Sequence, residues 1–234
     1  FGFCAFAHGF SSMRRIGEWL APILAAPHSA IAIGFAFLIA PSGWIVRALS
    51  PWLTGWTLPP DVASVGDAAG IALVLGLLLK EVPYLILMIA GALHQVPVRQ
   101  HLAIARSLGY SRAEAWVKTI LPQIYPQIRL PIYAVIAFSL SVVDVALILG
   151  PSNPPTLALL AVRWFTDADI RFYFPAAAAA TLLLLLVVVV VAAWFGGERI
   201  VTRLGRRWIA RGGRASGVTV GAGLATGIFG VVFA

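Results

Sequence analysis

The stretch Val98–Pro126, VRQHLAIARSLGYSRAEAWVKTILPQIYP, is the longest polar interval between apolar runs that are long enough to cross a bilayer. Its first part has one apolar face, because apolar residues recur at helical spacing. These residues are Val98, Leu102, Ala105 and Leu108. Gly109 follows where a helix C-cap favours a residue at positive φ. Ser111 and Glu114 have the spacing of a capping box, in which each side chain accepts a hydrogen bond from the other residue's backbone N–H. The stretch therefore predicts two short amphipathic helices joined by a capped turn.

A second apolar stripe follows this turn. It is formed by Ala113, Trp116, Val117 and Ile120. Pro122 and Pro126 are expected to stop or kink the chain after it, since proline lacks the N–H of a helix interior. Two capped amphipathic helices between membrane spans are typical of a docking element.

The same residues resemble the EAA loop of permease subunits in ATP-binding-cassette (ABC) importers. The resemblance rests on Ala105, Leu108, Gly109, Ser111, Leu121, Pro122 and Pro126. In that family a Glu-Ala-Ala opening precedes a glycine, and a Leu-Pro pair follows at a fixed distance that Gly109 and Pro122 keep. The opening here reads Ala103-Ile104-Ala105, so the family's glutamate is absent.

The resemblance implies a helical membrane domain in which this loop rests in a groove of a cytoplasmic ATPase. The implied coupling residues are Ala103, Ala105, Leu108, Gly109, Ser111, Glu114, Leu121 and Pro122. It also implies two ATPase subunits that hydrolyse ATP, an extracytoplasmic substrate-binding protein and a second permease half, fused or separate. This chain itself is then not an enzyme and needs no cofactor. The segments PHSAIAIGFAFLIAPSGW and SVVDVALILGP further resemble large fused permeases of the thiamine and iron(III) type.

Composition independently indicates an integral membrane protein. The 234 residues are 60% hydrophobic and 11% charged, and the mean hydropathy is +0.92. A soluble domain of this length needs more charge to cover its surface. The net charge of +8 does not indicate a nucleic-acid partner, because the basic residues cluster in connectors between apolar runs.

The apolar runs predict an all-α membrane bundle of the type I ABC importer class. Four complete spans are expected, at residues 27–49, 68–93, 130–149 and 175–195, since about 20 apolar residues cross a bilayer. Partial spans are expected at both ends, so the chain is interpreted as a piece of a longer permease. Residues 1–216 would form one permease half, truncated at the N-terminus, and residues 217–234 would begin a further span.

The basic residues predict the orientation in a bacterial inner membrane. Thirteen of the 17 Lys and Arg residues lie in connectors on the side of the 94–129 loop. The opposite loops contain Arg47, Arg163 and Arg171. The positive-inside rule therefore places the 94–129 loop and residues 198–216 in the cytoplasm. The basic segment from Arg199 to Arg214 is interpreted as a contact with anionic lipid rather than as a binding site.

Three ionisable residues fall at membrane depth: Lys80, Glu81 and Asp144. Such residues are costly in a bilayer and usually face a bundle interior or a watery cavity. Lys80 and Glu81 are neighbours and cannot share one helix face, so a Lys80–Asp144 ion pair between spans is plausible. The pair could fix helix packing, or the residues could belong to a translocation path.

The sequence supports other classes of protein less well. A secondary transporter using Lys80, Glu81 and Asp144 is the main alternative, because such transporters also carry intramembrane charges. A membrane enzyme would need more convergent acids or nucleophiles, and a scaffold gives no reason for a capped helix pair. The histidines lack partners at metal-ligand spacing, and no P-loop pattern occurs, so neither a metal nor an ATP site is expected.

The predicted topology can be tested with reporter fusions. Fusions near Arg112 and Arg206 are expected to report the cytoplasm, and fusions near Asp61 and Asp167 the opposite side. A single fusion on the wrong side contradicts the assignment of spans.

Overall fold

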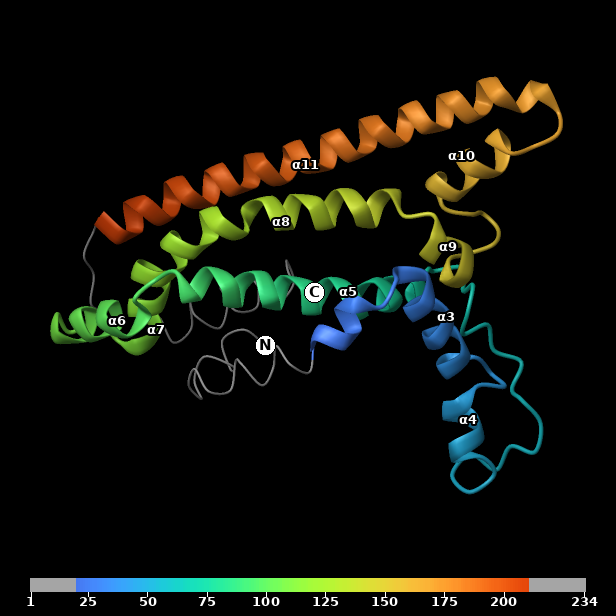
Figure 1. Cartoon of the computed structure of the whole chain (residues 1–234), viewed down its shortest axis with the longest axis horizontal. Helices are drawn as coiled ribbons and strands as arrows, with labels where there is room; N and C mark the ends of the chain where they lie inside the picture. Colours follow the sequence, from blue (N-terminus) through green and yellow to red (C-terminus); the bar gives the residue numbers. More distant parts are fainter. Residues whose placement is uncertain (1–19, 211–234) are drawn as a thin grey trace. The chain divides into compact units, whose positions relative to one another are not determined.

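The computed structural model describes residues 20–210, and every regular element in that part of the chain is helical (Figure 1). The chain divides into two compact units. Within the described residues, the hairpin unit comprises Tyr84–Val135 and residues 189–210, and the broken-helix unit comprises residues 20–83 and Ile136–Val188. Three helices contribute residues to both units: α5 (Ile71–His94), α8 (Leu121–Ser141) and α11 (Tyr173–Ala210). The predicted all-α fold is confirmed.

The broken-helix unit contains short helices between the longer ones. They are α3 (His28–Ile39), α4 (Trp44–Leu49), α9 (Asp144–Leu149), α10 (Leu157–Phe165) and the 3-10 turn η2 (Ile170–Phe172). Small and branched side chains form its core: Ala32, Ala72, Val142, Val145 and Leu149. Gly76 of α5 makes room for the Leu149 side chain, because a Cβ there would lie 2.3 Å from Leu149 Cδ1. The core therefore depends on close approach as well as on apolar area.

A short segment before α5 satisfies backbone groups at the ends of three helices. Ser64 Oγ donates to the carbonyl of Ile39, at the end of α3, at 2.6 Å. The N–H of Gly66 donates to the carbonyl of Leu149, at the end of α9, at 3.3 Å. Asp67 accepts from the N–H groups of Ala72 and Ile71, at 2.9 and 2.7 Å, at the start of α5. These two hydrogen bonds lower the pKa of the Asp67 carboxyl, so it stays charged at the positive end of the helix.

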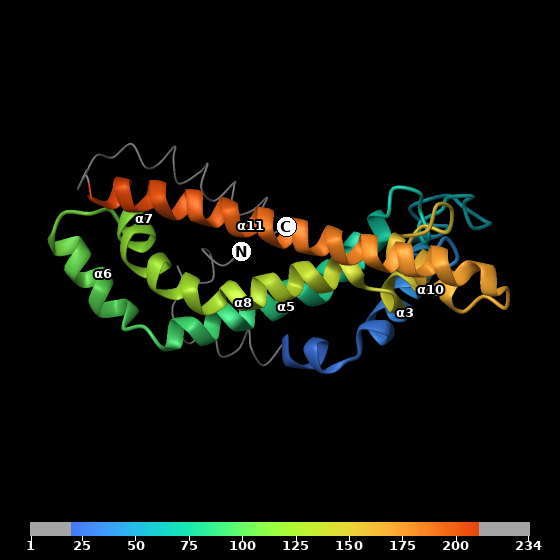
Figure 2. The same cartoon turned by 90° about the horizontal axis from the view of Figure 1, so that it is seen from above.

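The hairpin unit contains the stretch that the sequence singles out. After α5 come α6 (Val98–Ser107), α7 (Arg112–Ala115), the π-helical segment η1 (Trp116–Ile120) and the first part of α8. Figure 2 shows α6 and α7 as the two green arms of a hairpin. One stripe of η1 and α8 is buried at every fourth residue, which is the spacing of one helix face: Ile120, Ile124, Ile128 and Ile132.

Three segments of the described chain are long and apolar enough to cross a membrane. They are His28–Leu49, Ile71–His94 and Ile170–Ala210. The first contains a break: α3 ends at Ile39, and Ala40, which precedes Pro41, has the extended ψ of 150° that a following proline favours. These three segments overlap the predicted spans at residues 27–49, 68–93 and 175–195.

The remaining predicted span, at residues 130–149, is divided between two helices. Helix α8 ends at Ser141, and α9 begins at Asp144. The break falls on Val142 and Val143, which lie between the two helices. Asp144 then lies in the first turn of α9, where a negative charge suits the helix N-terminus. The run is therefore divided between two helices, although its hydropathy is nearly continuous.

The break between α3 and α4 depends on Gly43. A Cβ at this position would lie 2.3 Å from the carbonyl oxygen of Phe37 and 2.8 Å from that of Ala40, and backbone cannot move aside cheaply. We expect Gly43→Ala to lower the free energy of unfolding by about 1–3 kcal/mol, as overpacking does. The measurement is the thermal unfolding midpoint of the full chain in detergent.

Gly34→Ala is the matched control, because a Cβ at Gly34 in α3 meets nothing within 4 Å. A helix-interior alanine should leave the midpoint unchanged or raise it. Equal losses in both variants would contradict the steric account of this break.

Candidate functional site

The turn between α6 and α7 is a Schellman motif. The N–H of Tyr110 donates to the carbonyl of Ala105 at 3.1 Å, and the N–H of Gly109 donates to the carbonyl of Arg106 at 3.0 Å. These two bonds satisfy carbonyls at the end of α6. Gly109 has φ +86°, a conformation that side chains with a Cβ avoid. The predicted glycine cap is confirmed.

The capping box after the turn is also confirmed. The N–H of Ser111 donates to Glu114 Oε2 at 3.1 Å, and the N–H of Glu114 donates to Ser111 Oγ at 3.2 Å. Glu114 is only 2% exposed, so its carboxylate is held inside the hairpin rather than presented to solvent. The turn is thus fixed from both sides, and α6 and α7 keep a defined angle.

The prolines after the hairpin were expected to stop or kink the chain, and the structure shows that they do not stop the helix. Pro122 lies in the first turn of α8, directly after the π-helical segment η1, and α8 continues past Pro126 to Ser141. A proline ring clashes with the carbonyl one α-turn earlier, and a π segment widens that turn. Gln123 Nε2 donates to the backbone carbonyl of Thr119 at 2.5 Å.

The predicted coupling residues divide into a buried and an exposed set. Ala105 and Glu114 are buried, and Leu121 is half-buried. The others are exposed: Ala103, Leu108, Gly109, Ser111 and Pro122. Leu108 belongs to the predicted apolar face and is 52% exposed, at the C-cap of α6. Ile104 is 59% exposed on the same helix, so α6 presents an apolar surface.

Lys118 ties the hairpin to the end of α11. Its Nζ lies 4.7 Å from the centre of the Tyr110 ring and 4.4 Å from that of Trp208. Figure 2 shows the red end of α11 beside the hairpin. A cation between two aromatic faces is attracted by both ring quadrupoles. This contact was not predicted from the sequence, because Lys118 and Trp208 are far apart in the chain. The available signal was that aromatic residues lie near Lys118 in the sequence.

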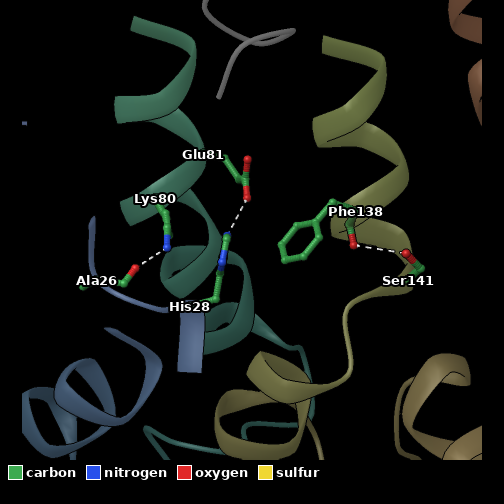
Figure 3. A network of polar contacts seen from close by, with 6 residues as sticks. All are labelled: Ala26, His28, Lys80, Glu81, Phe138 and Ser141. Atoms are coloured by element: carbon green, nitrogen blue, oxygen red, sulfur yellow. Dashed lines mark hydrogen bonds and ion pairs between the residues drawn. The ribbon is translucent and has the colours of Figure 1, made fainter. Parts of the chain in front are cut away.

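The polar residues predicted at membrane depth have other partners than expected (Figure 3). The ammonium of Lys80 donates to the backbone carbonyl of Ala26. Glu81 Oε1 lies 3.4 Å from His28 Nε2, and the His28 ring packs against Phe138 with ring centres 4.6 Å apart. Lys80 and Glu81 are both buried. These two contacts join the middle of α5 to the start of α3 and to the residue Ala26 that precedes it.

The predicted Lys80–Asp144 ion pair is not formed. Asp144 is exposed at the start of α9 and makes no ion pair within the described residues. The prediction was wrong because it placed Asp144 inside a continuous span, whereas the break at Val142–Val143 makes it a helix-terminal residue.

A further polar cluster, between α8 and α11, was not predicted from the sequence. Arg129 of α8 lies with Nη1 3.7 Å from Glu198 Oε1 of α11. Tyr133, one turn after Arg129, donates its hydroxyl to Glu198 Oε2. Glu198 directly precedes the basic segment from Arg199 to Arg214 and is the only acidic residue of the sequence from 198 to 216, and that isolation was the available signal.

Sequence comparison identifies a relative. Over 157 residues, or 67% of this chain, the sequence is 38% identical to the inner membrane ABC transporter permease protein YnjC of Escherichia coli (strain K12). The chain is an ABC permease homologue. The aligned part spans 29% of the length of YnjC. No family model matches the chain, and no solved structure matches it.

The homology and the helices agree on class and location. An ABC permease homologue with three membrane-length apolar helices is a multi-pass α-helical protein of the bacterial inner membrane. The homology supports a membrane permease subunit of an ABC transporter. The roles of the coupling residues and of the charges at membrane depth stay predictions.

The contact between His28 and Glu81 in this ABC permease homologue can be tested by a double-mutant cycle. His28→Ala and Glu81→Ala should be non-additive by about 0.5–3 kcal/mol in the free energy of unfolding, because they remove the same interaction. Lys80→Ala and Asp144→Ala should add within about 0.5 kcal/mol. Unfolding in detergent measures both cycles, and strong coupling in the second with none in the first would contradict the described contacts.

Proposed function

We propose that this chain is part of the translocation domain of an ABC importer, and that the hairpin of α6, α7 and η1 is its contact with a cytoplasmic ATPase. The observation that carries the proposal is a hairpin capped on both sides of its turn that exposes the apolar side chains of Ile104 and Leu108. An apolar pair on a rigid helix suits a groove in a partner protein.

The contact would couple ATP hydrolysis to the membrane domain mechanically. ATP-driven closure of the ATPases moves the hairpin, and a two-state membrane domain responds by changing its conformation. Such a hairpin must be stiff, and the fixed turn and the cation–π contacts of Lys118 supply stiffness. The excess of basic residues supports a cytoplasmic position for the 94–129 loop.

Other partners follow from the importer proposal. They are a second ATPase subunit, an extracytoplasmic substrate-binding protein, a second permease half and the lipid bilayer; no nucleic acid is involved. ATP hydrolysis belongs to the partner, so this chain has no catalytic residues or cofactor of its own. The resemblance to thiamine and iron(III) permeases stays a prediction.

A role for Lys80, Glu81 and Asp144 in the translocation path also stays a prediction. A secondary transporter that uses these charges was the alternative, but the similarity to an ABC permease favours the importer. Lys80 joins α5 to the segment before α3, and Glu81 joins it to the first residue of α3, which suits a packing role.

The proposal can be tested at Gly109. A valine there is forced to φ +86°, at a cost of about 1–2 kcal/mol, so α6 and α7 should lose their fixed angle. We expect Gly109→Val to insert into the membrane normally and to lose ATPase co-purification and substrate-stimulated ATP hydrolysis together. Glu114→Ala should be milder, since half of a capping box contributes about 1 kcal/mol.

Gly196→Val is the control, because a Cβ at Gly196 in α11 meets nothing within 4 Å. It should leave ATPase recruitment unchanged. Normal recruitment and turnover in Gly109→Val would show that the hairpin is not the mechanical contact.

A further inference from the structure

An open pocket of about 400 Å³ lies in the hairpin unit, where α8 meets the last turns of α11. Its lining contains four arginines, one glutamate, one threonine and one aromatic residue: Arg129, Phe195, Glu198, Arg199, Thr202, Arg203 and Arg206. Six of these residues are spaced by three or four along α11, so they share one face of that helix. Arg129 joins them from α8.

The pocket carries an uncompensated positive charge. Glu198 is already engaged by Arg129 and by the Tyr133 hydroxyl. Within the described residues, no carboxylate pairs with Arg199, Arg203 or Arg206, whose side chains are exposed. Four arginines against one glutamate leave an excess of positive charge in the lining. Such a site favours an anion.

Two details of hydrogen bonding favour a phosphate group. Arg129 Nε is buried and has no hydrogen-bond acceptor in the described part of the chain, so a ligand oxygen would satisfy it. Arginine guanidinium groups also match the geometry of phosphate oxygens, with two parallel N–H donors. Thr202 does not add a donor, because its hydroxyl already donates to the Glu198 carbonyl at 2.7 Å.

The position of the pocket along α11 favours a lipid as the source of that phosphate. The helix carries exposed apolar side chains just before the pocket: Leu182, Leu184, Leu185, Val188 and Val189. From Val189 to Glu198 the helix rises by about 14 Å at 1.5 Å per residue. A headgroup in the pocket therefore leaves its acyl chains beside an apolar helix surface. Basic pockets between membrane helices on the cytoplasmic side are known to bind anionic headgroups.

We propose that the pocket formed by Arg129, Arg199, Arg203 and Arg206 binds the phosphate of one anionic phospholipid headgroup. This site is more specific than general attraction between basic residues and a charged membrane. The difference is geometric: Arg206 lines the pocket, whereas its neighbour Arg207 does not.

The test uses the full chain in neutral detergent, titrated with phosphatidylglycerol or phosphatidylcholine, and counts retained lipids by native mass spectrometry. We expect one tightly held phosphatidylglycerol per chain and at least about tenfold weaker retention of phosphatidylcholine. Each arginine near an anionic surface contributes roughly fivefold in affinity. Arg203→Gln with Arg206→Gln should therefore weaken phosphatidylglycerol retention by more than about tenfold.

The matched control is Arg171→Gln with Arg207→Gln, which removes the same charge outside the pocket. It should change retention by less than about twofold. Equal losses in the two double variants would overturn the proposal, because they indicate only non-specific attraction. Should the pocket double variant not fold, Arg206→Gln against Arg207→Gln makes the same comparison with one charge each.

A soluble phosphate is distinguished in a second arm with inorganic phosphate alone. If inorganic phosphate at roughly physiological ionic strength displaces phosphatidylglycerol completely, a lipid is not the preferred ligand and the proposal is overturned. Retention of phosphatidylglycerol in its presence supports a site that recognises headgroup and acyl chains together.

Discussion

Every helix end leaves backbone N–H and C=O groups without partners inside the helix, and a fold with many short helices must satisfy them elsewhere. The broken-helix unit does so largely through one segment, Ser64–Asp67, which hydrogen-bonds to the ends of α3 and α9 and to the start of α5. These bonds satisfy backbone groups at the end of α3, where the break at residues 40–43 begins, and at the end of α9, which follows the break at residues 142–143. The packing of Leu149 against Gly76 then brings α9 onto α5.

The hairpin unit solves the same problem locally. A Schellman motif and a capping box use residues that are close in sequence, so the turn at Gly109 needs little help from the rest of the chain. The outward side of α6 is therefore available for a partner, and Ile104 and Leu108 remain exposed. A rigid turn with an apolar surface is what a mechanical contact with an ATPase requires.

Charged side chains in both units have partners that reduce the cost of burial. Lys80 contacts Ala26 before α3, and Glu81 contacts the first residue of α3. Arg129 and Glu198 join α8 to α11. An unpaired charge at the buried positions of Lys80 and Glu81 would carry most of the cost of desolvation. Because Glu198 balances only one arginine of its cluster, the surplus positive charge at the end of α11 is left for an external anion.

The sequence by itself determined the class, the helical content and the turn at residues 107–114, because hydropathy, capping and glycine conformation act over a few neighbouring residues. It did not determine that residues 130–149 are broken at Val142–Val143, since a uniformly apolar run hides a local break. It also gave the wrong partner for Lys80, because residues far apart in sequence meet only after helices pack. The meeting of Arg129 with Glu198, and of Lys118 with Trp208, was likewise decided by tertiary structure: helix periodicity assigns a residue to a face, but only packing decides what that face meets.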